Sequence, residues 1–132
     1  MIALLLMQAS LDPIGRQALP ASGCAAFLWS RGDAPQLVAM VGAEPGSLKL
    51  RFDGKTVELP RTAAEGAAGR GLPAQSRYAA GDVTATVALS AQDRADLSDG
   101  ALVSDATLTV ARTGKDTTVV PAGGLIGCAP VR

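Results

Sequence analysis

The sequence predicts an all-β domain, either a small antiparallel β-barrel or a β-sandwich, with roughly seven to nine strands closed by one disulfide. From Cys24 onward, short runs that alternate apolar and polar residues are separated by turn residues, and no long stretch has the spacing of an amphipathic helix. The chain has two cysteines, Cys24 and Cys128, at the two ends of this β-rich region. An even cysteine count favours a disulfide in an exported protein, and two free thiols are the alternative for a cytosolic protein.

A chain of 132 residues is long enough for one domain around a single hydrophobic core. We expect residues 24–132 to form this single β domain. Residues 1–23 are expected to hold a truncated signal segment followed by a linker. The linker, residues 11–23, contains several prolines and glycines and shows no sustained periodicity.

The composition argues against several classes of function. Twelve basic residues balance twelve acidic residues, so no net field attracts nucleic acid or anionic lipid. The chain has no histidine, which removes the usual general base near neutral pH and the commonest transition-metal ligand. Two Phe, one Trp and one Tyr are too few to stack single-stranded nucleic acid. We therefore expect no metal, no cofactor and no nucleic-acid partner.

Residues 2–7, IALLLM, resemble the end of a secretory signal, although they lack a basic region and are short for an apolar core. A true translation start upstream of Met1 would supply both features, so we expect a periplasmic or secreted protein. The alternative is an N-terminal strand or packed tail. No stretch approaches the roughly 18 apolar residues of a transmembrane helix, and we expect no transmembrane segment.

Residues 21–24, ASGC, resemble a lipobox, in which the cysteine becomes lipidated after signal cleavage. A lipobox requires an apolar segment immediately upstream, but the polar residues Asp12, Arg16 and Gln17 separate IALLLM from Cys24. We therefore expect no lipid anchor and place Cys24 at the start of the first core strand.

Residues 47–59, SLKLRFDGKTVEL, give the clearest local prediction, a β-hairpin. A two-residue type I′ turn at Asp53-Gly54 aligns apolar residues on one face and places Lys49 opposite Glu58 on the other. The pairs expected on the apolar face are Phe52 with Lys55, Leu50 with Val57, and Leu48 with Leu59.

Two later segments alternate in the same way. In residues 82–90, DVTATVALS, and 106–112, ATLTVAR, every second residue is apolar, which is typical of a strand with one buried face. The inward residues are expected to be Val83, Ala85, Val87, Leu89, Leu108 and Val110. A turn at residues 113–116 then returns the chain, and Val119 is expected to meet Val110.

Three carboxylates, Asp93, Asp96 and Asp99, are spaced three apart in QDRADLSDG. The spacing does not match an EF-hand, and Arg94 partly neutralises the charge. A solvated turn is the favoured interpretation, because aspartates stabilise turns through local backbone hydrogen bonds. The alternative is a hydrolase that uses these carboxylates as catalytic acids and bases.

Residues 24–41 contain two strands that are apolar on both faces. One explanation is a central pair of strands covered on both sides within the fold. The other is an exposed patch that binds a partner or the retained N-terminal segment. The residues of this predicted patch are Phe27, Trp29, Val38 and Met40.

A cysteine near each end, FDGKTVELP at 52–60 and AQSRY at 74–78 together resemble the small periplasmic inhibitors of C-type lysozyme, which are disulfide-bearing antiparallel β-barrels. In that family a Ser-Gly-x-x-Tyr-type segment enters the lysozyme cleft. The resemblance implies that Ser76, Arg77 and Tyr78 contact a partner. Here the serine and tyrosine are only two apart, and no glycine follows the serine. The chain also looks like uncharacterised small envelope proteins of high-GC Gram-negative bacteria.

The expected function is therefore that of a non-enzymatic, exported β protein that binds another cell-envelope component, such as an envelope protein. One alternative is an inhibitor of a lysozyme or protease. The other is a hydrolase that uses the aspartate cluster.

Overall fold

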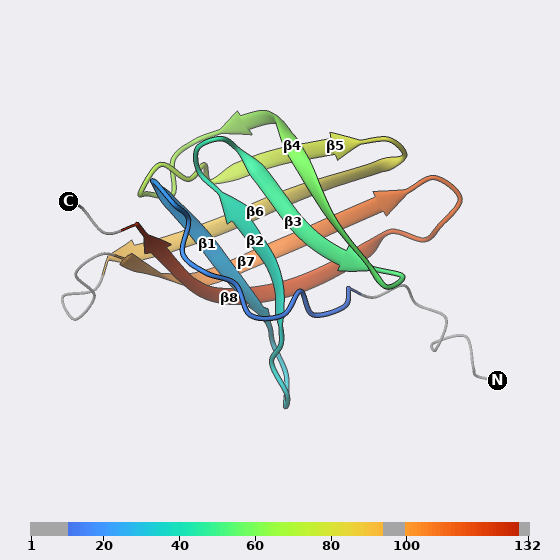
Figure 1. The fold of residues 1–132 in the computed structure, drawn as a ribbon, viewed down its shortest axis with the longest axis horizontal. Helices are drawn as coiled ribbons and strands as arrows, with labels where there is room; N and C mark the ends of the chain where they lie inside the picture. Colours follow the sequence, from blue (N-terminus) through green and yellow to red (C-terminus); the bar gives the residue numbers. More distant parts are fainter. Residues whose placement is uncertain (1–10, 94–99, 130–132) are drawn as a thin grey trace.

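A computed structural model of the chain describes residues 11–93 and 100–129, and within these residues it contains eight β-strands and no helix. The strands form a closed barrel in which each strand pairs with the next along the chain (Figure 1). The predicted all-β fold is confirmed, with a barrel rather than a sandwich. The strands are β1 (Cys24–Ser30), β2 (Leu37–Gly42), β3 (Ser47–Phe52), β4 (Lys55–Glu65), β5 (Gln75–Ala80), β6 (Val83–Asp93), β7 (Gly100–Arg112) and β8 (Thr118–Cys128).

The barrel closes where β1 pairs with β8 in antiparallel fashion. Cys24 is aligned with Cys128 in this ladder, and their sulfurs form a disulfide across 104 positions of sequence. The predicted disulfide is therefore confirmed. It joins the first strand to the last, where no connecting loop holds the sheet together.

The interior is filled mainly by aliphatic side chains that alternate along each strand. In β6, for example, Val83, Ala85, Val87 and Leu89 are buried, as the sequence pattern predicts. One polar ring also lies inside, because Tyr78 is fully buried. The largest fully buried side chains are Tyr78, Leu28, Leu48, Leu50, Leu72, Leu108, Ile126, Val41, Val87 and Val103.

The predicted hairpin at residues 47–59 is confirmed in its full register. β3 and β4 pair as Phe52 with Lys55, Leu50 with Val57, Leu48 with Leu59, and Lys49 with Glu58. Both turn residues, Asp53 and Gly54, have positive φ, as a type I′ turn requires. Although Lys49 faces Glu58 in the ladder, its ammonium donates a hydrogen bond to Gln17 Oε1 at 2.9 Å.

The predicted contact between Val119 and Val110 is wrong by one residue. Val110 pairs with Thr118, and Val119 pairs with Thr109 and is 60% exposed. The Lys115 amide donates to Arg112 O at 3.0 Å around Gly114, which has positive φ. The pairing therefore returns one residue earlier than a turn at residues 113–116 would allow, and Val119 lies on the outer face.

Close backbone packing along β8 depends on glycine. A Cβ at Gly124 would overlap the carbonyl oxygen of Phe27 on β1. The sequence Gly123-Gly124 therefore lets β8 approach β1 at the seam where the barrel closes.

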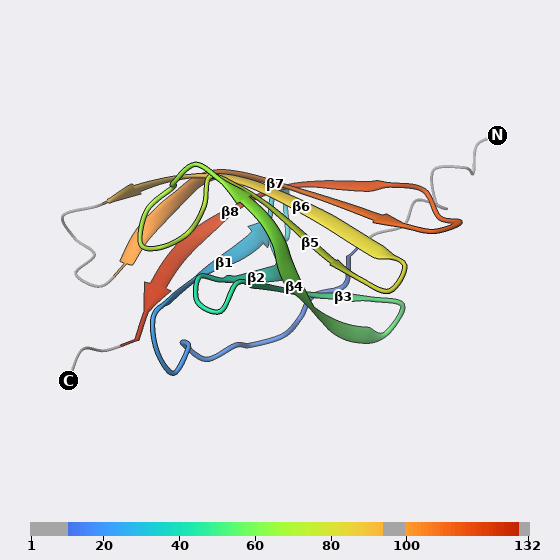
Figure 2. The same cartoon turned by 90° about the horizontal axis from the view of Figure 1, so that it is seen from above.

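Residues 11–23 run along the outside of the barrel before entering β1, as the blue segment in Figure 2 shows. The amide of Asp12 donates to Arg51 O at 2.8 Å on β3, and the amide of Ile14 donates to Leu37 O at 2.9 Å on β2. We call residues 11–17 the strap, because these bonds fasten them across neighbouring strands. The apolar run at residues 2–7, on which the export prediction depends, lies outside the described residues.

Candidate binding site

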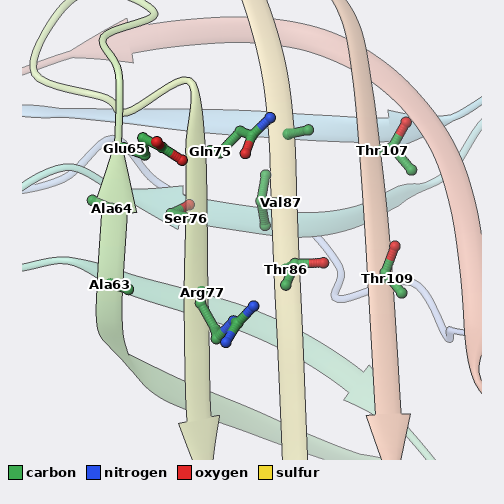
Figure 3. A pocket seen from close by; sticks show the side chains of 11 residues that line it. Ala63, Ala64, Glu65, Gln75, Ser76, Arg77, Thr86, Val87, Thr107 and Thr109 are labelled. Atoms are coloured by element: carbon green, nitrogen blue, oxygen red, sulfur yellow. The ribbon is translucent and has the colours of Figure 1, made fainter.

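A groove of about 650 Å³ crosses the outer face of the barrel over strands β4 to β7 (Figure 3). Eleven residues from these four strands line it: Ala63, Ala64, Glu65, Gln75, Ser76, Arg77, Thr86, Val87, Ala88, Thr107 and Thr109. We call it the outer groove.

The alternation of the strands determines which side chains enter the outer groove. On β5, Gln75 and Arg77 are exposed while Ser76 between them is buried. Pairing across the sheet then places Arg77 beside Thr86, and Thr86 beside Thr109. The result is a row of polar side chains from neighbouring strands on one surface, which Figure 3 shows.

The polar groups of the outer groove are available to a ligand. Arg77 and Glu65 are both exposed, and within the described part of the chain neither side chain forms a hydrogen bond or ion pair. Hydroxyl groups of Thr86, Thr107 and Thr109 lie on the neighbouring strands. Ala63, Ala64 and Ala88 contribute apolar surface to the lining. The groove can therefore offer a cation, a carboxylate and several hydroxyls to one polar partner.

The structure corrects the prediction that Ser76, Arg77 and Tyr78 form one contact surface. Ser76 is 6% exposed and Tyr78 is 0% exposed, whereas Arg77 faces the outer groove. Residues two apart on a strand share a face, so the serine and tyrosine both point inward. The Ser76 hydroxyl donates a hydrogen bond to Tyr78 Oη at 2.8 Å, and burial raises the pKa of the Tyr78 phenol.

The predicted patch of Phe27, Trp29, Val38 and Met40 is also divided by the structure. Val38 is the extra residue of a bulge in the β1–β2 pairing, and its side chain belongs to the core at 3% exposure. Phe27 and Trp29 lie beside the strap, where Phe27 is buried and Trp29 is half-buried. Met40, opposite Phe27, is also half-buried. These four residues do not form a single exposed surface.

Of the predicted aspartate cluster, the structure describes Asp93 alone. Asp93 ends β6, is exposed, and lies 3.5 Å from the Arg70 guanidinium. Asp96 and Asp99 lie outside the described residues. Within residues 11–93 and 100–129, no three His, Cys, Asp or Glu side chains come together as metal ligands.

An ion pair between Arg112 and Asp53, at the end of the barrel away from the disulfide, was not predicted from the sequence. The guanidinium of Arg112 on β7 lies 2.6 Å from the Asp53 carboxylate in the β3–β4 turn and 4.4 Å from the centre of the Phe52 ring. The hydrogen bond from Arg112 to the Asp53 carboxylate, together with the positive charge of Arg112, lowers the pKa of Asp53. Because it joins two hairpins that are far apart in sequence, no local pattern reveals it.

No protein-family model, no curated protein and no solved structure matches this chain. The described residues also include no helix with the length and apolar character needed to cross a bilayer.

Proposed function

We propose that this chain is a non-enzymatic, exported protein that binds another component of the cell envelope through the outer groove. The observation that carries the proposal is that Arg77, which has no side-chain partner among the described residues, lines one concave surface together with the exposed Glu65. Concave surfaces with a few convergent polar groups are typical of binding sites. A polar segment of a partner protein is the ligand that this mixture of charges and hydroxyls suits best.

The lining of the outer groove favours binding over catalysis. Glu65 is the single carboxylate among its described lining residues, so these residues supply no second carboxylate to divide the roles of acid and base. The hydroxyl of Ser76, which could act as a nucleophile, donates to Tyr78 on the interior side. The hydrolase alternative therefore draws no support from the groove.

The Cys24–Cys128 disulfide supports the export part of the proposal. Disulfides persist in oxidising compartments and are rare in the cytosol. This chemistry supports a periplasmic or secreted location.

Inhibition of a lysozyme or protease is a special case of the same function. Arg77 is the one residue of the Ser76–Tyr78 segment that is exposed for such a contact. An inhibitor would therefore act through Arg77 and its neighbours in the outer groove, not through a loop that carries all three side chains.

The test uses charge reversal in the groove. Wild-type protein, Arg77→Glu and Lys115→Glu are immobilised and exposed to envelope extract from the source cells, and retained proteins are quantified by mass spectrometry. Lys115 is exposed in the β7–β8 turn, so its reversal changes the net charge equally but away from the groove.

We expect at least one protein to be retained by wild type and Lys115→Glu but about tenfold less by Arg77→Glu, since like charges brought together at an interface weaken it strongly. The same retention by all three forms would count against the outer groove. Inhibition assays with lysozyme and with secreted proteases on these three proteins test the special case.

A further inference from the structure

A second pocket, of about 440 Å³, lies between the strap and the outer face of β1 and β2. Its walls include Arg16, Gln17, Phe27, Trp29, Gln36 and Leu37. We call it the strap pocket. It uses none of the strands β4 to β7 that form the outer groove, so it is an independent feature of the molecule.

Hydrogen bonds attach the strap to the sheet beside the strap pocket. The amide of Ile14 donates to Leu37 O on β2, and Lys49 on β3 donates to the side chain of Gln17. The side-chain Nε2 of Gln17 in turn donates to Ile14 O at 3.1 Å. These bonds fix the strap relative to the sheet, and a pocket formed in advance binds without the entropy loss of ordering a loop.

One wall of the strap pocket is apolar and aromatic. Phe27 and Trp29 are alternate residues of β1 and face outward, at positions that are polar on most strands of a barrel with a packed interior. Phe27 is buried, while Trp29 and Leu37 keep part of their surfaces accessible. An apolar group entering the pocket would cover that remaining surface.

The positive charge of Arg16 determines which polar group of a ligand the strap pocket would favour. Arg16 lines the pocket, is exposed, and has no hydrogen-bond or ion-pair partner in the described part of the chain. Among residues 11–93 and 100–129, no carboxylate lines the pocket, so no described lining residue neutralises this guanidinium. A guanidinium favours a carboxylate because it can donate two parallel hydrogen bonds to it.

We infer that the strap pocket binds a small amphipathic carboxylate, with its apolar body against Phe27, Trp29 and Leu37 and its carboxylate beside Arg16. A medium-chain fatty acid has this chemistry. The inference does not depend on the outer groove, and either site can fail without the other.

Trp29 makes the test direct, because it is the one tryptophan of the chain and lines the pocket. Full-length protein is titrated with decanoate, with decanol and with decyltrimethylammonium, while tryptophan emission is recorded. We expect a saturable change with decanoate, and affinity at least tenfold weaker for the alcohol and the cation.

Two variants separate the pocket from general surface binding. Arg16→Gln should weaken decanoate binding at least fivefold, whereas Arg77→Gln, which removes the same charge from the outer groove, should leave it unchanged. Circular dichroism confirms that both variants fold. The inference is overturned if decanoate gives no saturable change, if the three amphiphiles bind alike, or if Arg16→Gln binds decanoate as wild type does.

Discussion

Removing the Cys24–Cys128 disulfide is expected to lower the free energy of unfolding by about 4–5 kcal/mol. The bond joins residues separated by 104 positions, so it closes almost the whole barrel into one loop. For a loop of about 100 residues, the chain-entropy relation gives roughly 4.7 kcal/mol at 25 °C. A domain of this size is usually stable by only about 5–15 kcal/mol, so the loss would leave a marginal fold.

The measurement is urea unfolding followed by circular dichroism for the wild type, the reduced wild type and the Cys24→Ala/Cys128→Ala double variant. Reduction keeps the side chains and removes only the bond, which separates the effect of the cross-link from that of lost packing. The melting temperature of both bond-free forms should fall by roughly 15–20 °C. A loss below about 1 kcal/mol in the reduced wild type would refute the reasoning, because the bond would then restrict the unfolded chain very little.

Three further changes test individual contacts. Gly124→Ala should destabilise the barrel by about 1–3 kcal/mol, measured by urea unfolding, because its Cβ meets the Phe27 carbonyl at the seam. Burial raises the pKa of Tyr78, so the contribution of the neutral phenol to stability is present below pH about 10 and is lost as the pH rises further. In Tyr78→Phe, the fall of the urea midpoint at alkaline pH should therefore be smaller. Arg112 lowers the pKa of Asp53 from 3.8, so the contribution of this carboxylate to stability is present above pH 3.8 and is lost as the pH falls through the lowered pKa. In Asp53→Asn, the loss of stability at acid pH should therefore be less steep. An unchanged pH profile in either variant would exclude that group as the cause.

The β3–β4 hairpin was predictable to the residue because three local signals agree. The Asp53-Gly54 turn, the apolar pairs and the opposite charges select one register. At the β7–β8 turn no such agreement specifies the register, and a pairing that returns one residue earlier turns Val119 outward. Register is therefore predictable where turn chemistry and both strand faces select the same pairing.

The candidate sites were less predictable, because each joins segments that are distant in sequence. The outer groove needs Glu65 on β4 and Thr109 on β7 on one surface, and this follows only from the strand order of the closed barrel. The apolar outer positions of β1 were visible in the sequence, whereas the strap that flanks them is a proline- and glycine-containing segment with no periodic pattern. Alternation along β5 would have excluded Ser76 and Tyr78 from the surface once the strand was identified.

The role of the outer groove is tested most directly by site-specific photo-crosslinking in the source cells. Benzoylphenylalanine is placed at Thr109, inside the groove, or at Thr56, an exposed threonine at the far end of β4. After irradiation, we expect one defined crosslinked protein from the Thr109 position and none from the Thr56 position. Crosslinks from Thr56 alone, or equal yields from both positions, would show that the partner binds elsewhere on the barrel.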